Sequence, residues 1–571
     1  MHGTANPKAT LFNALVLDMA VPSANTLLPL LRKLFDNGTR ELARACAAGS
    51  SLDSQALDLH QGPCFELAWA SADLQAAEQL AAVLHLLPQA QTRLGLAFIA
   101  EAVASVITRL QQIHLDLGLD GQALDDFAVS PELAELRRCA MTSTLLARLG
   151  QQIIDAPEML SLRTTEDGIA LARDTFERFA SEMVAPMAQK IHRDDLTVPE
   201  SLLQPLRELG VFGLSIPQEF GGSASGGSHD AALMIAVTEA LSEASLSAAG
   251  SLITRPEILA RALLVGGTHE QKQKWLPRIA SGELLCSIAI TEPDHGSDVA
   301  GLTLAATPAP GGWQLQGSKT WCTFAGKAQL IMVVCRTHKD RSLGHRGLSV
   351  ILVEKPSFEG HSFQCSSPGG GTLSGWAIPT IGYRGMHSFD LAFDGFMVPE
   401  ANLIGGQAGI GKGFYYTMAG MTGGRLQTSG RACGVMRAAI KAAIGHSLDR
   451  RVFGAPLASY PLTQIKIARM AARYLACRQL AEATAHAADK EAGSAVRAIE
   501  ASLAKLLSCR SAELVTREAL QIFGGMGYAE ETVVSRLFVD ARVLSIFEGA
   551  EETLALKVIA RGLLEAALAS S

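Results

Sequence analysis

Apolar residues recur at helical spacing through most of this 571-residue chain, and the period changes in one central stretch. Near the start, the stretches 66–80 and 94–107 place apolar side chains every three or four positions, which predicts amphipathic helices. A second helical block precedes the change of period. Within it, Thr268 followed three residues later by Gln271 predicts a capping box at the start of a helix.

The central stretch has the pattern of strands. Its β-branched runs at 330–335 and 348–353 lie between turns rich in Gly and Pro. Helical spacing then returns and holds to the end of the chain. The pattern predicts an α+β protein, mainly α, in four segments: an N-terminal helical extension (1–160), a helical domain (161–285), a β domain (286–404) and a C-terminal helical segment (405–571).

Composition narrows the class of protein. The formal net charge of −7 argues against nucleic acid as a main partner. The ten cysteines form no CxxC pair, so neither a zinc site nor a disulfide framework is indicated, and a reducing compartment is expected. The start of the chain lacks the basic and apolar runs of a secretory signal, and polar residues interrupt the apolar segments. We therefore expect a cytoplasmic protein that does not enter a membrane.

Two patterns suggest chemistry that we reject. Residues 406–412 satisfy the GxxxxGK form of a phosphate-binding loop, but Gly413 stands where that loop needs Ser or Thr, and no buried strand leads directly into it. The fourteen histidines show no HxxxH or HExxH pair, so the sequence assigns no metal site.

Four short blocks in a fixed order carry the informative chemistry. They are Ile290-Thr-Glu-Pro-Asp-His-Gly-Ser-Asp298, Lys319-Thr-Trp-Cys-Thr323, Gln521-Ile-Phe-Gly-Gly-Met-Gly-Tyr528 and Leu544-Ser-Ile-Phe-Glu-Gly-Ala-Glu-Glu-Thr553. Together the blocks resemble the acyl-CoA dehydrogenase family, over roughly residues 165–565. The resemblance implies the acyl-CoA dehydrogenase fold, with a helical domain, a β-barrel-like domain and a C-terminal four-helix bundle. The N-terminal extension falls outside that common core.

The resemblance implies that Glu548 is the base that removes the α-proton of an acyl-CoA thioester. Such a base needs a pKa raised by a water-poor site, to which Ile546 and Phe547 would contribute. Taken alone, Glu548 would more often be an exposed glutamate at a helix end. Some relatives carry the base on an internal helix; the matching position here is Gly424, before Arg425, and it has no carboxylate. The resemblance also places four residues at the substrate: Ser297, Arg425, Phe547 and Gly549.

The resemblance further implies FAD, which would accept the β-hydride at N5. The residues that would hold it are Ile288, Ile290, Thr291, Ser297, Trp321, Thr323, Arg450, Phe453, Gln521, Gly524 and Gly525. Arg450 would reach the flavin nucleotide's pyrophosphate from a neighbouring subunit, which implies a homodimer or homotetramer. Without the resemblance, Trp321 could be an ordinary core residue and Arg450 a solvated helix cap.

The substrate is a finer expectation. Four features most resemble the (2S)-methylsuccinyl-CoA dehydrogenases of the bacterial ethylmalonyl-CoA pathway, which form mesaconyl-CoA: the long extension, the segment 381–386, the Phe-Glu-Gly-Ala form of the base motif and Pro461. The family resemblance implies an electron-transferring flavoprotein as the electron acceptor, and this finer one implies a bacterial source. A buried substrate carboxylate would need a cation, for which Arg255 is the candidate; an exposed Arg255 paired with Glu257 is equally compatible with the sequence. Another short, branched or thioether acyl-CoA, or a flavin-bearing DNA-protection protein, remains as an alternative, although the acidic charge opposes the latter.

Overall fold

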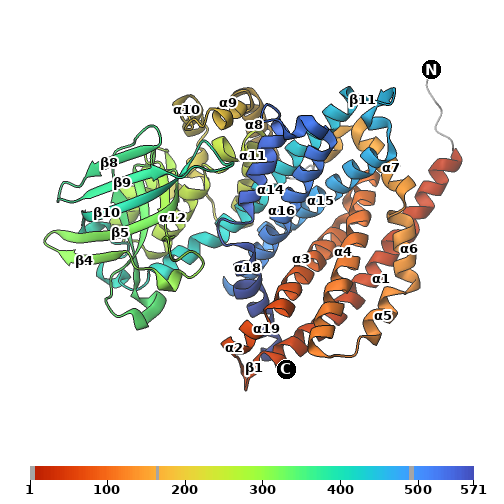
Figure 1. Ribbon diagram of the computed structural model, residues 1–571, viewed down its shortest axis with the longest axis horizontal. Helices are drawn as coiled ribbons and strands as arrows, with labels where there is room; N and C mark the ends of the chain where they lie inside the picture. Colours follow the sequence, from red (N-terminus) through yellow and green to blue (C-terminus); the bar gives the residue numbers. More distant parts are fainter. Residues whose placement is uncertain (1–6, 162–165, 488–493, 571) are drawn as a thin grey trace. The chain divides into compact units, whose positions relative to one another are not determined.

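The computed structural model describes residues 7–161, 166–487 and 494–570 (Figure 1). The chain divides into two compact units. One unit consists of residues 166–434, and the other joins residues 1–165 to residues 435–571. The sequence therefore folds its two ends into one unit, so the N-terminal extension shares a compact body with the C-terminal helices.

The unit 166–434 begins with a helical part. Its helices are α8 (Asp167–Phe179), α9 (Ala185–Arg193), α10 (Glu200–Glu208), α11 (Ser228–Ala244), α12 (Thr254–Gly266) and α13 (His269–Ala280). The capping box is confirmed at α13, where the Gln271 backbone N–H donates to the Thr268 hydroxyl and the Thr268 N–H donates to the Gln271 side chain.

An eight-stranded sheet follows in the same unit (Figure 1). Its strands run in the order β3-β6-β4-β5-β10-β9-β8, with β7 paired to β6. The two predicted strands are confirmed as β6 and β7. The bounds are β3 (Cys286–Ala289), β4 (Ala305–Ala309), β5 (Gly312–Thr323), β6 (Leu330–Arg336), β7 (Leu348–Glu354), β8 (Ser362–Ser366), β9 (Thr372–Ala377) and β10 (Ser388–Pro399).

Strand β6 is buried along its whole length because both faces of the sheet are covered there. Alternate side chains of the strand enter different cores. Leu330 and Met332 pack with helical residues such as Trp275, whereas Ile331 packs with residues of β5 and β10 such as Phe389. This explains why the run lacks the polar alternation of a half-exposed strand.

The rejected phosphate-loop pattern lies between β10 and α14 (Gly413–Asp449), a helix that runs from this unit into the other. A Cβ at Gly413 would lie 2.5 Å from the backbone of Ser349 in β7, and the Gly411 N–H donates to the Ser349 hydroxyl. Close packing against a strand therefore accounts for these glycines without a phosphate.

The other unit is helical apart from two short hairpins, among its described residues. Its N-terminal helices are α1 (Pro7–Ala45), α2 (Ser54–Leu59), α3 (Gln61–Val83), α4 (Gln89–Leu117), α5 (Gln122–Ala128), α6 (Pro131–Ala140) and α7 (Ser143–Asp155), with the hairpin β1 (Ala47–Ala48) and β2 (Ser51–Leu52). Its C-terminal part holds the end of α14, β11 (Arg451–Val452), β12 (Ala455–Pro456), α15 (Pro461–His486), α16 (Ser494–Phe523), α17 (Val533–Leu544), α18 (Glu551–Thr553), the π-helix η14 (Leu554–Ala560) and α19 (Arg561–Ala569).

Helices from the two ends of the chain pack directly against one another in this unit. The extension helix α7 lies along α15, α1 lies along α19, and α3 contacts η14. Gly150 of α7 lies so close to the backbone of Gln464 that a side chain there would collide with it. The extension therefore supports the C-terminal helices rather than forming a body of its own.

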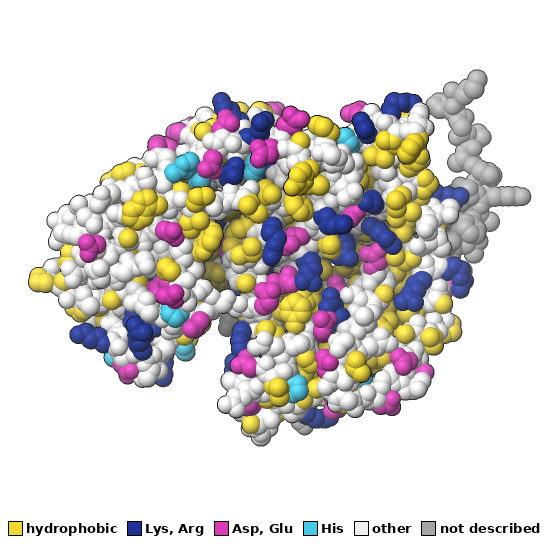
Figure 2. Space-filling view, in the orientation of Figure 1, with side chains coloured by type: hydrophobic (Ala, Val, Ile, Leu, Met, Phe, Trp, Pro, Cys, Tyr) yellow, Lys and Arg dark blue, Asp and Glu magenta, His cyan; other side chains and the backbone are white. Residues whose placement is uncertain are grey.

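One described helix, α4, is long and apolar enough to cross a membrane, with a mean hydropathy of 1.4, which corrects the expectation that polar residues would interrupt every such run. Because 67% of that stretch is buried against neighbouring helices, a core helix explains it equally well. On the face shown in Figure 2, acidic and basic side chains are intermingled rather than separated by sign.

Candidate active site

Glu548 lies in the turn that connects α17 to α18. It is half-buried and holds a left-handed backbone, with φ of 57°, which is uncommon for a residue with a side chain. Gly549 follows with φ of 104°, where glycine alone is unstrained. Phe547 is half-buried, but Ile546 is 52% exposed, so within its own unit Ile546 gives the carboxylate little of the expected apolar cover.

Two cations of α16 hold this turn in place, and the sequence analysis missed both. The ammonium of Lys505, which is 1% exposed, donates to the Gly549 carbonyl at 2.6 Å. Arg510 pairs with the carboxylate of Glu551, whose backbone N–H donates to the Ser545 carbonyl. Burial raises the pKa of Glu551, and Arg510 opposes that rise. A basic residue on the inner face of a predicted helix was the only signal for either contact.

The second group of candidate residues begins at β3, in the other unit. Ile288 is part of the strand, and Ile290 and Thr291 follow it, half-buried at the edge of the core. The Thr291 carbonyl accepts the Thr320 N–H at 2.9 Å, which places Thr291 beside the strand that carries Trp321. Ser297 is exposed in the loop beyond.

A buried ion pair lies directly beneath this segment. Lys319 and Glu292 meet at 2.8 Å, with side chains 0% and 3% exposed. Lys319 also donates to the Ile290 carbonyl at 2.7 Å, while Glu292 accepts from Thr303 and Leu304. Burial alone would raise the pKa of Glu292, but Lys319 and these donors hold it below its usual value. Although both residues lie within the informative blocks, the sequence did not reveal that they pair.

Trp321 is 55% exposed and holds a φ of 57°, at an irregularity in the pairing of β5 with β10. It is therefore not an ordinary core tryptophan within its own unit. Thr323 is buried two residues later, and its hydroxyl shares a hydrogen bond of 3.0 Å with that of Ser388. The strand thus presents a large aromatic face outward, with a hydroxyl close behind it.

Arg450 and Phe453 lie at the end of α14 and in the β11–β12 hairpin, and both are exposed. Phe453 is 98% exposed with φ of 47°. The ring of His446, one turn before Arg450, stacks on Phe523 with 4.0 Å between ring centroids. This contact brings the Arg450 segment next to the end of α16, where Gln521, Gly524 and Gly525 lie, all exposed.

Gly524 requires glycine because its φ is 61°. Added Cβ atoms at Gly524 and Gly525 would meet nothing within 4 Å. Internal packing therefore does not explain this pair of glycines, and their open surface leaves room for a ligand to approach the backbone closely.

Arg255 is buried in α12 and 7% exposed, so the alternative of an exposed arginine is wrong. Its Nη1 donates to the Ser251 carbonyl and to the Tyr383 hydroxyl, each at 3.1 Å. Glu257 does not pair with Arg255 in the contacts described; it accepts a hydrogen bond from Gln427 of α14.

Arg425 is buried on the same helix as Gln427, beside Gly424. The carboxylate of Glu257 lies against Gly423, where it would collide with any side chain at that position. A carboxylate is therefore present next to the alternative base position, although it comes from α12 and not from α14. It is a second base candidate that the sequence did not suggest.

Comparison with known proteins places these features in a family. The acyl-CoA dehydrogenase N-terminal, middle and C-terminal domain models match residues 167–283, 287–395 and 411–564. The chain is also 35% identical to the (2S)-methylsuccinyl-CoA dehydrogenase of Cereibacter sphaeroides, over 95% of this chain and 98% of that protein. The chain belongs to the acyl-CoA dehydrogenase family. It is thus an oxidoreductase that dehydrogenates an acyl-CoA, and its fold is the acyl-CoA dehydrogenase fold with an added N-terminal helical extension.

Two further relatives each match only part of this acyl-CoA dehydrogenase. An acyl-CoA dehydrogenase of Bacillus subtilis is 32% identical over 68% of this chain and 96% of its own length. The structure of butyryl-CoA dehydrogenase from Megasphaera elsdenii aligns with a TM-score of 0.62 and 28% identity, over 70% of this chain and 98% of that one.

Proposed function

We propose that this acyl-CoA dehydrogenase uses FAD to oxidise (2S)-methylsuccinyl-CoA to mesaconyl-CoA. One observation carries the choice of substrate: the similarity to the Cereibacter sphaeroides enzyme extends through the N-terminal helices, whereas the relative from Bacillus subtilis matches only about two-thirds of the chain. The extension packs against the segment that follows Glu548, so it is joined to the catalytic machinery rather than appended at a distance.

The residues present fit a flavin nucleotide. An outward-facing indole at Trp321 is suited to cover an aromatic ring system, and the open backbone at Gly524 and Gly525 is suited to a close approach by a dinucleotide. Thr291 and Thr323 offer polar groups near the indole, and Arg450 offers a guanidinium for a phosphate. When bound, the flavin accepts a hydride from the β-carbon of the substrate.

Glu548 takes the α-proton in this proposal. The left-handed backbone at Glu548 and the bonds from Lys505 and Arg510 to the following residues hold the turn that carries its side chain. The Glu548 backbone N–H polarises the thioester carbonyl, as in the family, which stabilises negative charge at that oxygen as the proton leaves. A positioned base typically contributes on the order of 10²–10⁴ in rate.

Arg255 receives the free carboxylate of the substrate. A guanidinium has five N–H donors, and the two hydrogen bonds described for Arg255 both come from Nη1. The cation is already desolvated in the protein, and Tyr383 and Ser251 hold it in one orientation, so a carboxylate could pair with it without ordering a flexible side chain.

The proposed assembly is a homodimer or homotetramer that delivers electrons to an electron-transferring flavoprotein. The exposed hairpin supports it: Phe453 is 98% exposed, more than any other large apolar side chain described, and Arg450 precedes it by three residues. In the assembly, both would lie against the cofactor of a neighbouring subunit.

Anaerobic bleaching of the flavin tests the substrate. The matched pair is (2S)-methylsuccinyl-CoA and 2-methylbutyryl-CoA, which differ only by a carboxylate in place of a methyl group. We expect the first to bleach the flavin at far lower concentration. Preference for the uncharged compound would overturn the methylsuccinyl assignment and leave the family membership intact.

Arg255→Met should reduce this discrimination by about 10²-fold or more, since losing one partner of a buried hydrogen-bonded charge pair costs about 2–5 kcal/mol. The control is Arg261→Met, an exposed arginine on the same helix, which should change nothing. An unchanged kcat/KM ratio between the two substrates in Arg255→Met would remove Arg255 from the site.

A further inference from the structure

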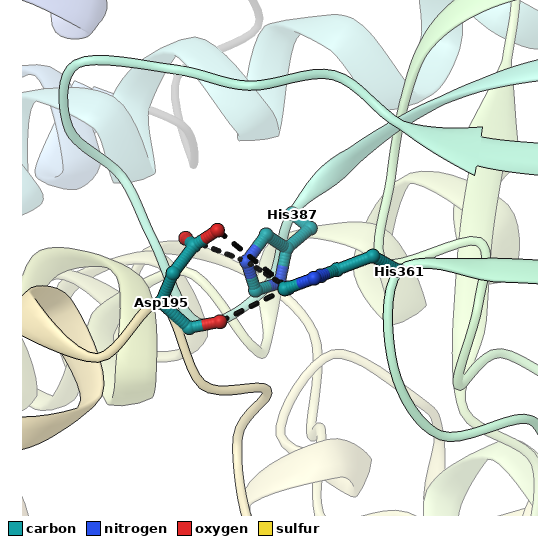
Figure 3. A group of neighbouring side chains, drawn as sticks. All are labelled: Asp195, His361 and His387. Atoms are coloured by element: carbon teal, nitrogen blue, oxygen red, sulfur yellow. Dashed lines mark hydrogen bonds and ion pairs between the residues drawn. The ribbon is translucent and has the colours of Figure 1, made fainter.

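Three polar side chains far apart in the sequence converge in the unit 166–434 (Figure 3). Asp195 follows α9, His361 directly precedes β8, and His387 directly precedes β10. Their side chains point toward a common centre, and one potential ligand atom from each lies within 4.8 Å of the others. We call these three residues the His–His–Asp cluster. None of them belongs to the candidate active site.

The spacing within the cluster matches the ligand shell of a small ion. The two imidazole Nε2 atoms are 3.2 Å apart, and His387 Nε2 lies 3.0 Å from Asp195 Oδ1. His361 Nε2 lies 3.6 Å from Asp195 Oδ2. Ligands of a tetrahedral Zn²⁺ lie at about 2.0–2.2 Å from the metal, so neighbouring ligand atoms lie about 3.3 Å from one another. The three distances found here lie around that value, with the two histidines facing different oxygens of the Asp195 carboxylate.

The arrangement can be held by hydrogen bonds or by a bound ion, and the two states use the imidazole nitrogens differently. Each Nε2 carries either one hydrogen or one lone pair. If both Nε2–H groups donate to Asp195, His387 to its carboxylate and His361 to its carbonyl, each at 3.0 Å, the two nitrogens still lie 3.2 Å apart without a bond between them. If either Nε2 instead keeps its lone pair, that lone pair faces an oxygen of Asp195. A cation between them would use both imidazole lone pairs and the carboxylate at once.

The surroundings suit a bound ion that reaches the site from solvent. His387 is 4% exposed and therefore fixed, whereas the side chains of His361 and Asp195 are 50% and 44% exposed. Arg384 is the competing cation: its Nε lies 3.6 Å from Asp195 Oδ1. It is held on that side by the carbonyls of Thr380 and His192.

We propose that the His–His–Asp cluster binds one divalent transition-metal ion, Zn²⁺ being the best fit, with water at the fourth position. Two imidazoles and one carboxylate are ligands that favour Zn²⁺ or Co²⁺ over Mg²⁺ and Ca²⁺. The ion would be structural. It would fasten the loop after α9 to the starts of β8 and β10.

This fastening has a consequence for the candidate active site. The His387 carbonyl accepts the Phe324 N–H at 2.8 Å, and the next residue, Ser388, bonds the hydroxyl of Thr323. An ion on His387 would therefore stiffen the segment that supports Trp321 and Thr323, without touching substrate itself.

The test uses the full-length holoenzyme after chelator treatment and dialysis. Zn²⁺ is titrated calorimetrically, and Co²⁺ is added to look for the visible bands of a tetrahedral cobalt site. The variant is His361→Gln, which removes a half-exposed ligand; the control is His338→Gln, an exposed histidine of the same unit. The buried cysteines are present in all three proteins, so any uptake by thiols cancels in the comparison.

We expect one Zn²⁺ per chain in the wild type and the control, with a rise in Tm on addition of Zn²⁺. In His361→Gln the affinity should fall by on the order of 100-fold, since even supporting residues around a metal cost 10–100-fold when lost. The cobalt bands and the Tm rise should disappear in this variant. Its Tm without metal should stay within a few degrees of the Tm of the metal-free wild type.

Stoichiometric Zn²⁺ uptake that is equal in wild type and His361→Gln would overturn the proposal, and so would an absence of uptake by the wild type. If His361→Gln fails to fold, Asp195→Asn replaces it as the variant, with the same expected losses and the same contrary results.

Discussion

The guanidinium of Arg510 lies over the indole of Trp69, 3.9 Å from the ring centroid, and the same guanidinium pairs with Glu551. Trp69 belongs to the N-terminal extension, and Glu551 follows Glu548 by three residues. One arginine therefore connects the extension to the segment that carries the candidate base. This gives the described part of the extension a physical role that its sequence did not suggest: Trp69 supplies a buried aromatic face against which that segment is positioned.

Arg510→Gln should impair catalysis more than stability. The lost cation–π contact and partly exposed ion pair are together worth about 1 kcal/mol. Misplacing the turn by a fraction of an ångström should lower kcat on the order of tenfold. Steady-state kinetics and thermal unfolding measure the two effects. Arg517→Gln, on the same helix and mainly exposed, is the control. If kcat is unchanged in Arg510→Gln, the extension does not position the base.

Lys319→Met should be strongly destabilising. It leaves the Glu292 carboxylate buried without its cation, which typically costs about 3–5 kcal/mol. Urea unfolding measures the loss, and flavin content reports on the segment from Ile290 to Thr291 above the pair. Lys339 is exposed, so the free energy of unfolding of Lys339→Met should lie within about 0.5 kcal/mol of that of the wild type. A loss below about 1 kcal/mol in Lys319→Met would show that the pair does not matter for folding.

Lys355 gives a pH-dependent prediction. Burial lowers its pKa to about 7, although two facing rings, Phe358 and Phe363, favour the charged form. An unfolded lysine titrates near 10.4, so between pH 7 and 10 the unfolded chain binds more protons. The contribution of Lys355 to the free energy of unfolding should therefore rise with pH across this window, by at most about 1.4 kcal/mol per pH unit, and stay flat below pH 7.

Urea unfolding of wild type and Lys355→Met at pH 7, 8 and 9 checks this prediction. The stability of the wild type relative to the variant should increase at each step. The free energy of unfolding of Lys339→Met should change with pH in the same way as that of the wild type. If the free energies of unfolding of Lys355→Met and the wild type changed equally with pH, Lys355 would keep an ordinary pKa in the folded protein.

The sequence was sufficient for features that depend on local patterns. Strands β6 and β7 follow from runs of β-branched residues, and the capping box at Thr268 depends on residues three apart. The family resemblance rested on residues within each block, so it needed no knowledge of packing. The roles assigned to the individual flavin and substrate residues remain predictions.

Contacts between distant segments could not be predicted in the same way. Lys319 and Glu292 are 27 residues apart, and their pairing depends on how β5 meets the segment after β3. Asp195 and His387 are separated by 192 residues, so no metal-binding spacing was visible. Arg255 is buried against Tyr383, which lies far along the chain. The residues next to Arg255 in the sequence therefore could not show whether its side chain is exposed or buried.

The central claim is that Glu548 is the base of an acyl-CoA dehydrogenase, and Glu548→Gln tests it most directly. The measurement is exchange of the substrate α-proton in D₂O, together with anaerobic flavin bleaching. Two variants serve as comparisons: Glu552→Gln, an exposed glutamate of the next turn, and Glu257→Gln, the buried carboxylate beside Gly423. We predict that Glu548→Gln retains its flavin and loses exchange and bleaching by at least about 10²–10⁴-fold, while Glu552→Gln behaves as wild type and Glu257→Gln still exchanges the proton. Near wild-type exchange in Glu548→Gln, with loss in Glu257→Gln, would contradict the account and assign the base to α12.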